Sequence, residues 1–290
     1  MPRDQRKRIS YAQNFLLRSK LAQLIIDQAA IGLDDLVIEI GPGRGALTRA
    51  LAAGCRQVIA IEKDPTLARR LGREVLTLNN VAIFEGDVLD LPLPVTPYKV
   101  VANIPFNITA AIVTKLVWAS NPPDGASLVI QREAAERFTG RPKQTLVALL
   151  IQPWFELTIA YHFRQNDFIP PPRVDVVLLR FSKRGPPLLN PAEDQEYRDF
   201  VTYGFTAWKP TLAQAYETVM PRSSLARLAK VSGLNLGLKP SEAPFAQWFA
   251  FYRAFARQAS AEQRRVIAGA EARLHAQQQQ HSKWNRTRGA

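Results

Sequence analysis

Between residues 20 and 181 the sequence alternates short apolar runs with amphipathic stretches of helix length, and this alternation restricts the fold more than any other feature. It is typical of a parallel sheet whose strands are connected through helices. Five of the runs are continuous in Val, Ile and Leu, as expected for strands that are covered on both faces. They are Leu36–Ile40, Gln57–Ile61, Val81–Phe84, Lys99–Ala102 and Ser127–Ile130. The sequence therefore predicts an α/β domain over residues 21–184.

Two later apolar runs, Phe155–Phe163 and Val174–Phe181, have no helical stretch between them. The segment that separates them contains Pro170, Pro171 and Pro172, and proline is tolerated in sheets at edges and turns. We expect these two runs to pair like a hairpin at the edge of the sheet.

The pattern changes after Arg184, where Gly185-Pro186-Pro187 marks a boundary. Residues 185–258 read as a small helical domain, with Ser241 as the expected N-cap of a helix that carries an aromatic stripe. An aromatic stripe at helical spacing is typical of a packed core. The stripe consists of Phe245, Trp248, Phe249, Tyr252 and Phe255.

The net charge of +13 lies mainly at the two ends of the chain. Residues 1–20 form a basic N-terminal arm, and residues 259–290 form a basic tail whose Gln277–Gln280 run and scattered arginines predict weak order. Solvated tails explain such ends, and so do extensions that hold the phosphates of a polyanion. Charge alone does not separate these two interpretations.

Several classes of protein are excluded by simple counts. The single cysteine, Cys55, has no partner for an intramolecular disulfide, and His162, His275 and His281 are spaced too widely for a metal-ligand motif. The charged N-terminus lacks the apolar run of a signal peptide, and no later run is long enough to span a bilayer. We therefore expect a soluble cytoplasmic monomer with neither a metal nor a membrane partner.

Candidate ligand-binding residues lie at the ends of the first three predicted strands, in an order typical of an adenosine-type cofactor site. Gly41 and Gly43 follow the first strand, where glycines let a ligand approach the backbone beside a helix N-terminus. Glu62 ends the second strand and can accept hydrogen bonds from ribose hydroxyls. Asp87 follows the third strand, where a carboxylate can accept a bond from an adenine amino group. Both NAD and S-adenosylmethionine carry these groups.

The fourth strand runs into Asn103-Ile104-Pro105-Phe106, which suits chemistry on an adenine amine. The N6 lone pair is delocalised into the ring, so a site must help to localise it. The Asn103 side-chain oxygen and a nearby main-chain carbonyl can accept the two N6 hydrogens, and Phe106 can stack on a base that is flipped out of an RNA helix. Pro105 restricts the turn. The methylated amine loses its proton to water, so the rate enhancement comes mainly from positioning.

Taken together, five segments resemble the ribosomal RNA adenine N6-methyltransferases, a family that includes the Erm resistance enzymes and the KsgA-type dimethyltransferases. They are Gln13–Leu16, Gly41–Gly45, Glu62, Gly86–Asp87 and Asn103–Phe106. The resemblance implies a Rossmann-like class I methyltransferase sheet with a small C-terminal helical domain, and S-adenosylmethionine as the cofactor. Residues 128–133 and 168–175 also follow the family, but no chemical role for them follows from the residues.

The resemblance also implies roles for individual residues. Asn14 and Leu16 border the cofactor, Gly41 lines its methionine end, and Asn103 and Phe106 contact the target base. Phe106 departs from the Tyr common at its position, which keeps the stacking surface but removes a hydroxyl. The full cofactor set is Asn14, Leu16, Gly41, Gly43, Glu62, Asp87, Val88 and Asn103, and the reaction centre is Asn103, Ile104, Pro105 and Phe106.

Within the family, Asp175–Leu179 and Phe245–Trp248 resemble the Erm branch. That branch implies methylation of one adenine in 23S rRNA, which adds bulk and removes a donor where macrolides, lincosamides and streptogramin B pack. A KsgA-type 16S rRNA dimethyltransferase is the alternative within the family. A non-catalytic RNA-binding assembly factor would leave the cofactor residues without a role, and an NAD oxidoreductase would leave Asn103–Phe106 without one.

Overall fold

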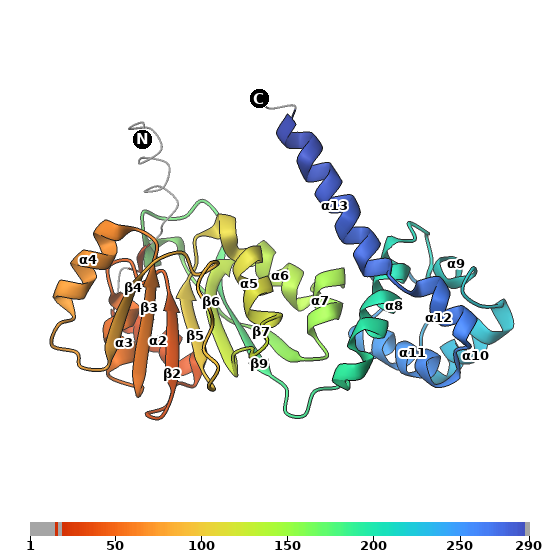
Figure 1. Ribbon diagram of the computed structural model, residues 1–290, viewed down its shortest axis with the longest axis horizontal. Coiled ribbons are helices and arrows are strands. Elements are labelled where there is room, and N and C mark those ends of the chain that lie inside the picture. The colour runs from red at the N-terminus through yellow and green to blue at the C-terminus, as the bar shows by residue number, and fades with distance from the viewer. Residues whose placement is uncertain (1–14, 17–18, 288–290) are drawn as a thin grey trace. The chain divides into compact units, whose positions relative to one another are not determined.

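The computed structural model describes residues 15–16 and 19–287, with side-chain environments for residues 20–280. The chain divides into two compact units (Figure 1). Unit 1 comprises residues up to 139 together with 155–185, and unit 2 comprises residues 140–154 together with those from 186 onward. In the described part of the chain, no helix is both long and apolar enough to cross a bilayer.

Unit 1 is built on a sheet of seven described strands in the order β4-β3-β2-β5-β6-β9-β7. The first five are mutually parallel, whereas β9 runs antiparallel to both β6 and β7. The predicted strands are confirmed to within one or two residues at their ends, and so is the edge pair β7 and β9. The strands are β2 (Leu36–Ile40), β3 (Gln57–Glu62), β4 (Val81–Glu85), β5 (Lys99–Asn103), β6 (Gly125–Gln131), β7 (Phe155–His162) and β9 (Val176–Lys183).

Helices α3, α4 and α5 connect parallel strands, as the alternating pattern predicts, whereas the described chain passes from β4 to β5 without a helix. The apolar sides of the helices of unit 1 pack on the sheet: Ile25 of α2 and Leu51 of α3 share one core with Val37, Val58 and Val101 of the strands. Asp64 caps α4 through main-chain N–H bonds from Thr66 and Leu67. The helices are α2 (Ser19–Ala29), α3 (Ala46–Ala52), α4 (Pro65–Glu74), η1 (Phe106–Ile108), α5 (Thr109–Val117) and α6 (Arg132–Thr139).

A second, two-stranded sheet gives the 168–175 segment a structural role. β8 (Phe168–Ile169) pairs antiparallel with β1 (Phe15–Leu16), after the short η2 (Gln165–Asp167). Phe168 is buried in the core of unit 1, so β8 fixes β1 to this unit. At the end of the segment, the Arg132 guanidinium pairs with the Asp175 carboxylate at 3.1 Å.

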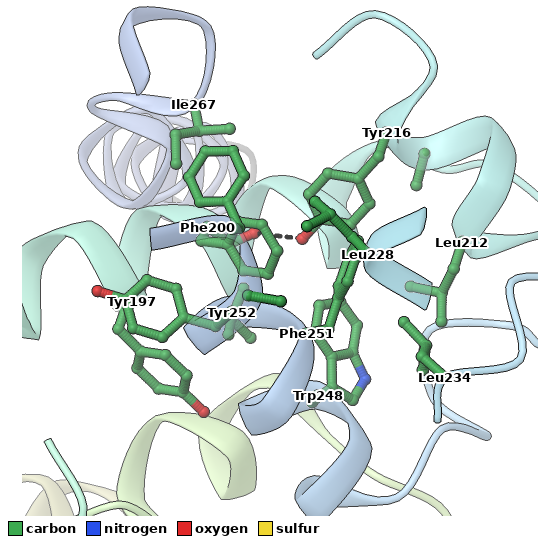
Figure 2. Close-up of a cluster of buried hydrophobic side chains, with 14 of the residues drawn as sticks. Tyr197, Phe200, Leu212, Tyr216, Leu228, Leu234, Trp248, Phe251, Tyr252 and Ile267 are labelled. Carbon is green, nitrogen blue, oxygen red and sulfur yellow. Dashed lines mark hydrogen bonds between the residues drawn. The ribbon is translucent and has the colours of Figure 1, made fainter. Parts of the chain in front are cut away.

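Unit 2 is helical and has an aromatic core. Figure 2 shows Phe200, Trp248 and Phe251 packed together, with the Tyr216 hydroxyl donating to the Phe200 carbonyl at 2.7 Å. The indole N–H of Trp248 donates to the Pro240 carbonyl at 2.9 Å. Its elements are α7 (Leu146–Ile151), η3 (Pro191–Glu193), α8 (Asp194–Thr206), α9 (Leu212–Tyr216), α10 (Arg222–Ser232), α11 (Phe245–Gln258), α12 (Ala261–Ile267) and α13 (Ala270–Thr287).

The predicted domain boundaries need one correction inside residues 21–184. Helix α7 groups with unit 2, because Leu149 and Leu150 belong to the aromatic core and the Tyr197 hydroxyl donates to the Leu149 carbonyl at 2.8 Å. The predicted N-cap at Ser241 is also wrong, since α11 begins after Pro244. The Ser241 carbonyl instead accepts a bond from the Gln144 main-chain N–H at 2.7 Å.

The prediction of a weakly ordered tail over residues 259–290 is wrong for its described part, which forms α12 and α13. Ser260 caps α12 in a reciprocal arrangement with Gln263, and Ile267 is buried. Asp199 of α8 accepts main-chain N–H bonds from Gly269 and Glu271 at 2.9 and 3.0 Å. These contacts hold the start of α13 against α8.

Candidate active site

The predicted site residues of unit 1 lie at the carboxyl ends of β2, β3, β4 and β5, and these ends meet at one edge of the sheet. Ile40 of β2 lies opposite Ile61 of β3 and Ala102 of β5, so the residues that follow these strands are neighbours. Glu62 lies opposite Glu85, the last residue of β4. The chain moves outward from β2 to β4 and then crosses to β5, so the strand order reverses between β2 and β5. Ligands of open α/β sheets bind at such a reversal, outside the carboxyl ends of the strands.

The glycine-rich turn after β2 keeps side chains away from this edge. Gly41 has a φ of 69°, in the left-handed region that favours glycine, and its N–H donates to the Ile61 carbonyl at 2.9 Å. A Cβ at this position would lie 3.7 Å from the Asn103 carbonyl oxygen, so β2 and β5 are close where they end. A Cβ on Gly45 would lie 2.3 Å from the Leu71 side chain, which makes a larger residue impossible there without a shift.

Glu62 fixes this turn and keeps acceptor capacity. Its side chain is 2% exposed, and its two carboxylate oxygens accept main-chain N–H bonds from Gly43 and Asp64, each at 3.0 Å. A carboxylate has about four acceptor sites, so two remain for hydroxyl donors. The geometry is compatible with the predicted ribose role, and it adds a second role that the sequence did not reveal.

Asp87 lies beyond the end of β4 and is ionised. Its Oδ1 accepts the Leu89 main-chain N–H at 2.9 Å, and its Oδ2 pairs with the Lys63 ammonium at 2.6 Å. The hydrogen bond from Lys63 is the largest cause of a pKa below the usual Asp range. An ionised carboxylate can accept a bond from an exocyclic amine. Val88, the next residue of the predicted set, is buried beside it.

The Asn103–Phe106 turn leaves the sheet at the end of β5. Ile104 is 2% exposed, and its N–H donates to the Val129 carbonyl of β6 at 3.3 Å. The Pro105 carbonyl accepts the Ile108 N–H at 3.1 Å, which begins the short helix η1. Asn103 and Phe106 are half-buried, and one side of Phe106 packs against the core of unit 1.

The N-terminal part of the predicted site is described only at β1. Leu16 lies in β1, opposite Phe168, and Asn14 lies outside the described residues. The structure thus brings Gly41, Gly43, Glu62 and the residues after β4 and β5 to one edge of unit 1.

Comparison with known proteins identifies the family to which this chain belongs. The family model for ribosomal RNA adenine dimethylase matches residues 4–257, most of the chain. The chain belongs to the ribosomal RNA adenine dimethylase family. The predicted enzyme class, an S-adenosylmethionine-dependent rRNA adenine methyltransferase with a class I sheet, is confirmed by this membership and by the fold.

Relatives of two kinds are similar to this member of the family. A ribosomal RNA small subunit methyltransferase A of Listeria monocytogenes is 31% identical over 78% of this chain and 81% of its own. An rRNA adenine N-6-methyltransferase of Bacillus licheniformis is 29% identical over 77% and 78%. Among solved structures, the 23S rRNA methyltransferase ErmE is 30% identical, with a TM-score of 0.79, over 84% of this chain and 100% of its own.

Sequence analysis missed two residues at this edge of unit 1. Lys63 pairs with Asp87, and an acidic residue at the end of the neighbouring strand was its only sequence signal. Glu39 in β2 is 1% exposed, and burial raises its pKa to about 8, reinforced by the nearby Glu62 carboxylate. Glu39 is therefore protonated at neutral pH, which avoids a second negative charge beside Glu62.

Proposed function

We propose that this enzyme methylates N6 of one adenine in 23S rRNA and thereby confers resistance to macrolides, lincosamides and streptogramin B. The similarity to ErmE carries the proposal, because it extends over the whole of that chain at 30% identity. The Erm-like segments Asp175–Leu179 and Phe245–Trp248 support it. We place the reaction on RNA in the cytoplasm, with a monomer as the active form.

We further propose that the carboxyl edge of unit 1 holds the cofactor. The residues fit an adenosine-containing group: Glu62 keeps two acceptor sites, Asp87 is ionised, and the turn at Gly41 presents backbone without side chains. S-adenosylmethionine supplies an electrophilic methyl group when bound. Glu62 then accepts from the ribose, Asp87 from the adenine amine beside Val88, and Gly41, Gly43, Asn14 and Leu16 border the rest.

Asn103 and Phe106 act on the target adenine in this proposal. The Asn103 side-chain oxygen accepts one N6 hydrogen and a neighbouring main-chain carbonyl accepts the other, which leaves the nitrogen lone pair directed at the methyl group. Phe106 stacks on the base. Ile104 and Pro105 hold the turn, the first through burial and its bond to Val129. The proton leaves to water after methyl transfer, so positioning supplies most of the rate enhancement.

Methylation of 16S rRNA is the second candidate function. It is supported by the relatives named small subunit methyltransferase A, which match this chain at 30–31% identity. The catalytic edge would be the same for either RNA, so the two candidates differ in substrate and not in chemistry.

Mapping of the methylated nucleotide tests the proposal. We expect purified enzyme to label protein-free 23S rRNA, or a hairpin copied from its peptidyl-transferase loop, and to leave assembled large subunits unmodified, because the target is accessible only before assembly. Expression in a macrolide-sensitive bacterium should raise resistance to all three drug classes. Labelling of 16S rRNA with 23S rRNA unmodified would contradict the proposal and favour the second candidate.

Asn103→Ala separates catalysis from binding in the same assay. We expect it to lower methyl transfer about a hundredfold or more, since a misplaced reacting group costs that much, and to abolish drug resistance. Cofactor affinity should change little. Asn107→Ala is the matched control, because Asn107 is exposed in the same turn and should remain active. Normal turnover by Asn103→Ala would remove this residue from the reaction centre.

A further inference from the structure

Trp208 of unit 2 is unusual both in its exposure and in its backbone conformation. Its side chain is 89% exposed, although tryptophan is a residue that usually buries its large apolar surface. Its φ is 53°, in the left-handed region that costs an L-residue energy and favours glycine. It directly follows Ala207, the C-cap of α8, where glycine is the usual choice. Neither packing nor helix termination explains a tryptophan at this position.

The backbone around Trp208 is nevertheless well held. The Ala207 N–H completes the last helical bond of α8 to Tyr203, and the next helix, α9, is capped by Thr211. The N–H groups of Leu212 and Ala213 donate to the Leu238 and Leu236 carbonyls at 2.9 and 3.0 Å. The exposed ring is therefore carried by a loop that is fixed on both sides.

Basic residues lie on the Trp208 loop and on two further loops of unit 2 that are linked to the start of α9 in turn. The segment 235–242 lies next to the start of α9, which follows the Trp208 loop, through those two main-chain bonds, and it carries the exposed Lys239. The segment 140–144 joins it through the bond from Gln144 to Ser241 and the Lys143–Glu242 ion pair of 3.2 Å. These loops carry four cations and two acids, and two of the cations are paired: Lys143 with Glu242, and Lys209 with Glu217 at 4.0 Å. The cations are Arg141, Lys143, Lys209 and Lys239.

We propose that Trp208 is a platform on which an unpaired base of the RNA substrate stacks, as a second base-binding site carried by unit 2. Aromatic rings bind any base through its π-face, and flanking cations hold the adjoining phosphates, which together are the usual means of binding single-stranded RNA. The strain at Trp208 is a cost that stacking offsets. The proposal rests on the proposed function, because it takes ribosomal RNA as the ligand.

Trp208→Gly gives a test in which stability and binding change in opposite directions. Glycine relieves the left-handed strain, so we expect the melting temperature to rise by about 2 °C. Loss of one stacked base should raise the dissociation constant for a 23S rRNA hairpin about tenfold or more. The KM for RNA should rise in parallel, with kcat at saturating RNA and cofactor affinity unchanged. A merely structural role would lower the melting temperature instead.

Two further variants sharpen the test. Trp208→Phe keeps a ring and should retain most of the affinity, whereas Val231→Ala removes another exposed apolar side chain of unit 2, 65% exposed, and should change nothing. An unchanged RNA dissociation constant for Trp208→Gly would overturn the proposal and favour a protein partner for this ring. A wild-type enzyme that methylates no ribosomal RNA would instead overturn the proposed function, so the two failures are distinguishable.

Discussion

Glu62 in unit 1 and Asp199 in unit 2 make nearly the same contacts, and they differ in what those contacts hold. Each carboxylate is buried, at 2% and 5% exposure, and each accepts two main-chain N–H bonds of 2.9–3.0 Å. Glu62 fixes a glycine-rich turn at the carboxyl edge of a parallel sheet, whereas Asp199 fixes the start of one helix on another. A buried acid therefore indicates a ligand site only where the fold leaves an edge for a ligand to bind.

The surroundings of the two acids differ as well. Next to Glu62 lies Glu39, an acid whose burial keeps it protonated, so unit 1 concentrates carboxyl groups at one edge. Next to Asp199, the Arg198 guanidinium makes a two-bond ion pair with Glu271, and both side chains are nearly buried. The Arg198–Glu271 pair thus balances two nearly buried charges at the start of α13, which it helps to fasten to α8.

The largest expected effect is a loss of stability when Asp199 of unit 2 is replaced. Asp199→Ala leaves the Gly269 and Glu271 N–H groups without their acceptor, and each buried unsatisfied donor costs about 1–3 kcal/mol. We expect the free energy of unfolding, measured with urea, to fall by about 2–5 kcal/mol. S-adenosylmethionine affinity should stay unchanged. Glu217→Ala, at the C-cap of α9 and an exposed acid of the same unit, is the control and should change stability by less than about 0.5 kcal/mol.

The two units also differ in how much of their structure was predictable from sequence. The strands of unit 1 and the polar residues that follow them were predictable because hydrophobic runs and strand ends are local features, and the parallel order then brings the ends together. The association of α7 with unit 2 and the order of α12 and α13 were not. They depend on bonds from Tyr197 to Leu149, from Arg198 to Glu271 and from Gly269 to Asp199, which join residues 48 to 73 positions apart.

Within the site, residue types were predictable but their partners were not. Asp87 and Glu62 follow recognisable strands, yet the ion pair of Asp87 with Lys63 and the bond from Gly43 to Glu62 appear only in the folded chain. The same holds for Glu39, whose pKa depends on complete burial among strands that are distant in sequence.

A smaller effect, on cofactor affinity, is expected when acids of unit 1 are replaced. Glu62→Ala and Asp87→Ala should each weaken S-adenosylmethionine binding by about 1.5–3 kcal/mol, the usual contribution of a hydrogen bond to a charged group. Calorimetric titration measures this loss. Glu85→Ala, at the exposed end of β4 two residues before Asp87, is the control and should bind normally. Unchanged affinity in both site variants would mean that the cofactor lies elsewhere, and unit 1 would then resemble unit 2 in using buried acids only for structure.

Glu39 of unit 1 should also make the stability of the protein depend on pH. Burial raises the Glu39 pKa from 4.5 to about 8, so the folded state binds one proton more than the unfolded state between these values. Stability from this group is therefore fully present below about pH 4.5 and is lost as the pH rises toward 8, by at most about 1.4 kcal/mol per pH unit. Glu39→Gln should remove this contribution. Urea unfolding of both proteins from pH 5 to 8 should give a stability difference that increases with pH in favour of Gln.

A constant difference between the two proteins across that range would show that Glu39 is not protonated in the folded state. In that event the carboxyl edge would hold two negative charges side by side, and its cofactor would have to compensate them.

The smallest expected effect concerns two adjacent arginines of α12. Both arginines belong to the basic tail over residues 259–290, for which the sequence left solvation and phosphate contact open, but the structure separates them. The Arg264 guanidinium pairs with Glu196 of α8 and donates to the Ala256 carbonyl, whereas Arg265 is exposed and has no ion pair among the described residues. In the basic N-terminal arm, residues 1–8 lie outside the described residues.

Arg265→Ala should therefore lower RNA affinity slightly and reduce the slope of log K against log salt by about 1, because one fewer counterion is released. Arg264→Ala should leave that slope unchanged and lower stability instead, because its charge already has a protein partner. Filter binding of a 23S rRNA hairpin from 50 to 200 mM salt measures the slopes, and urea unfolding measures the stability. Equal slopes for wild type and Arg265→Ala would show that Arg265 is solvated and makes no phosphate contact. Helix α12 would then have only a structural role in unit 2, as Asp199 does.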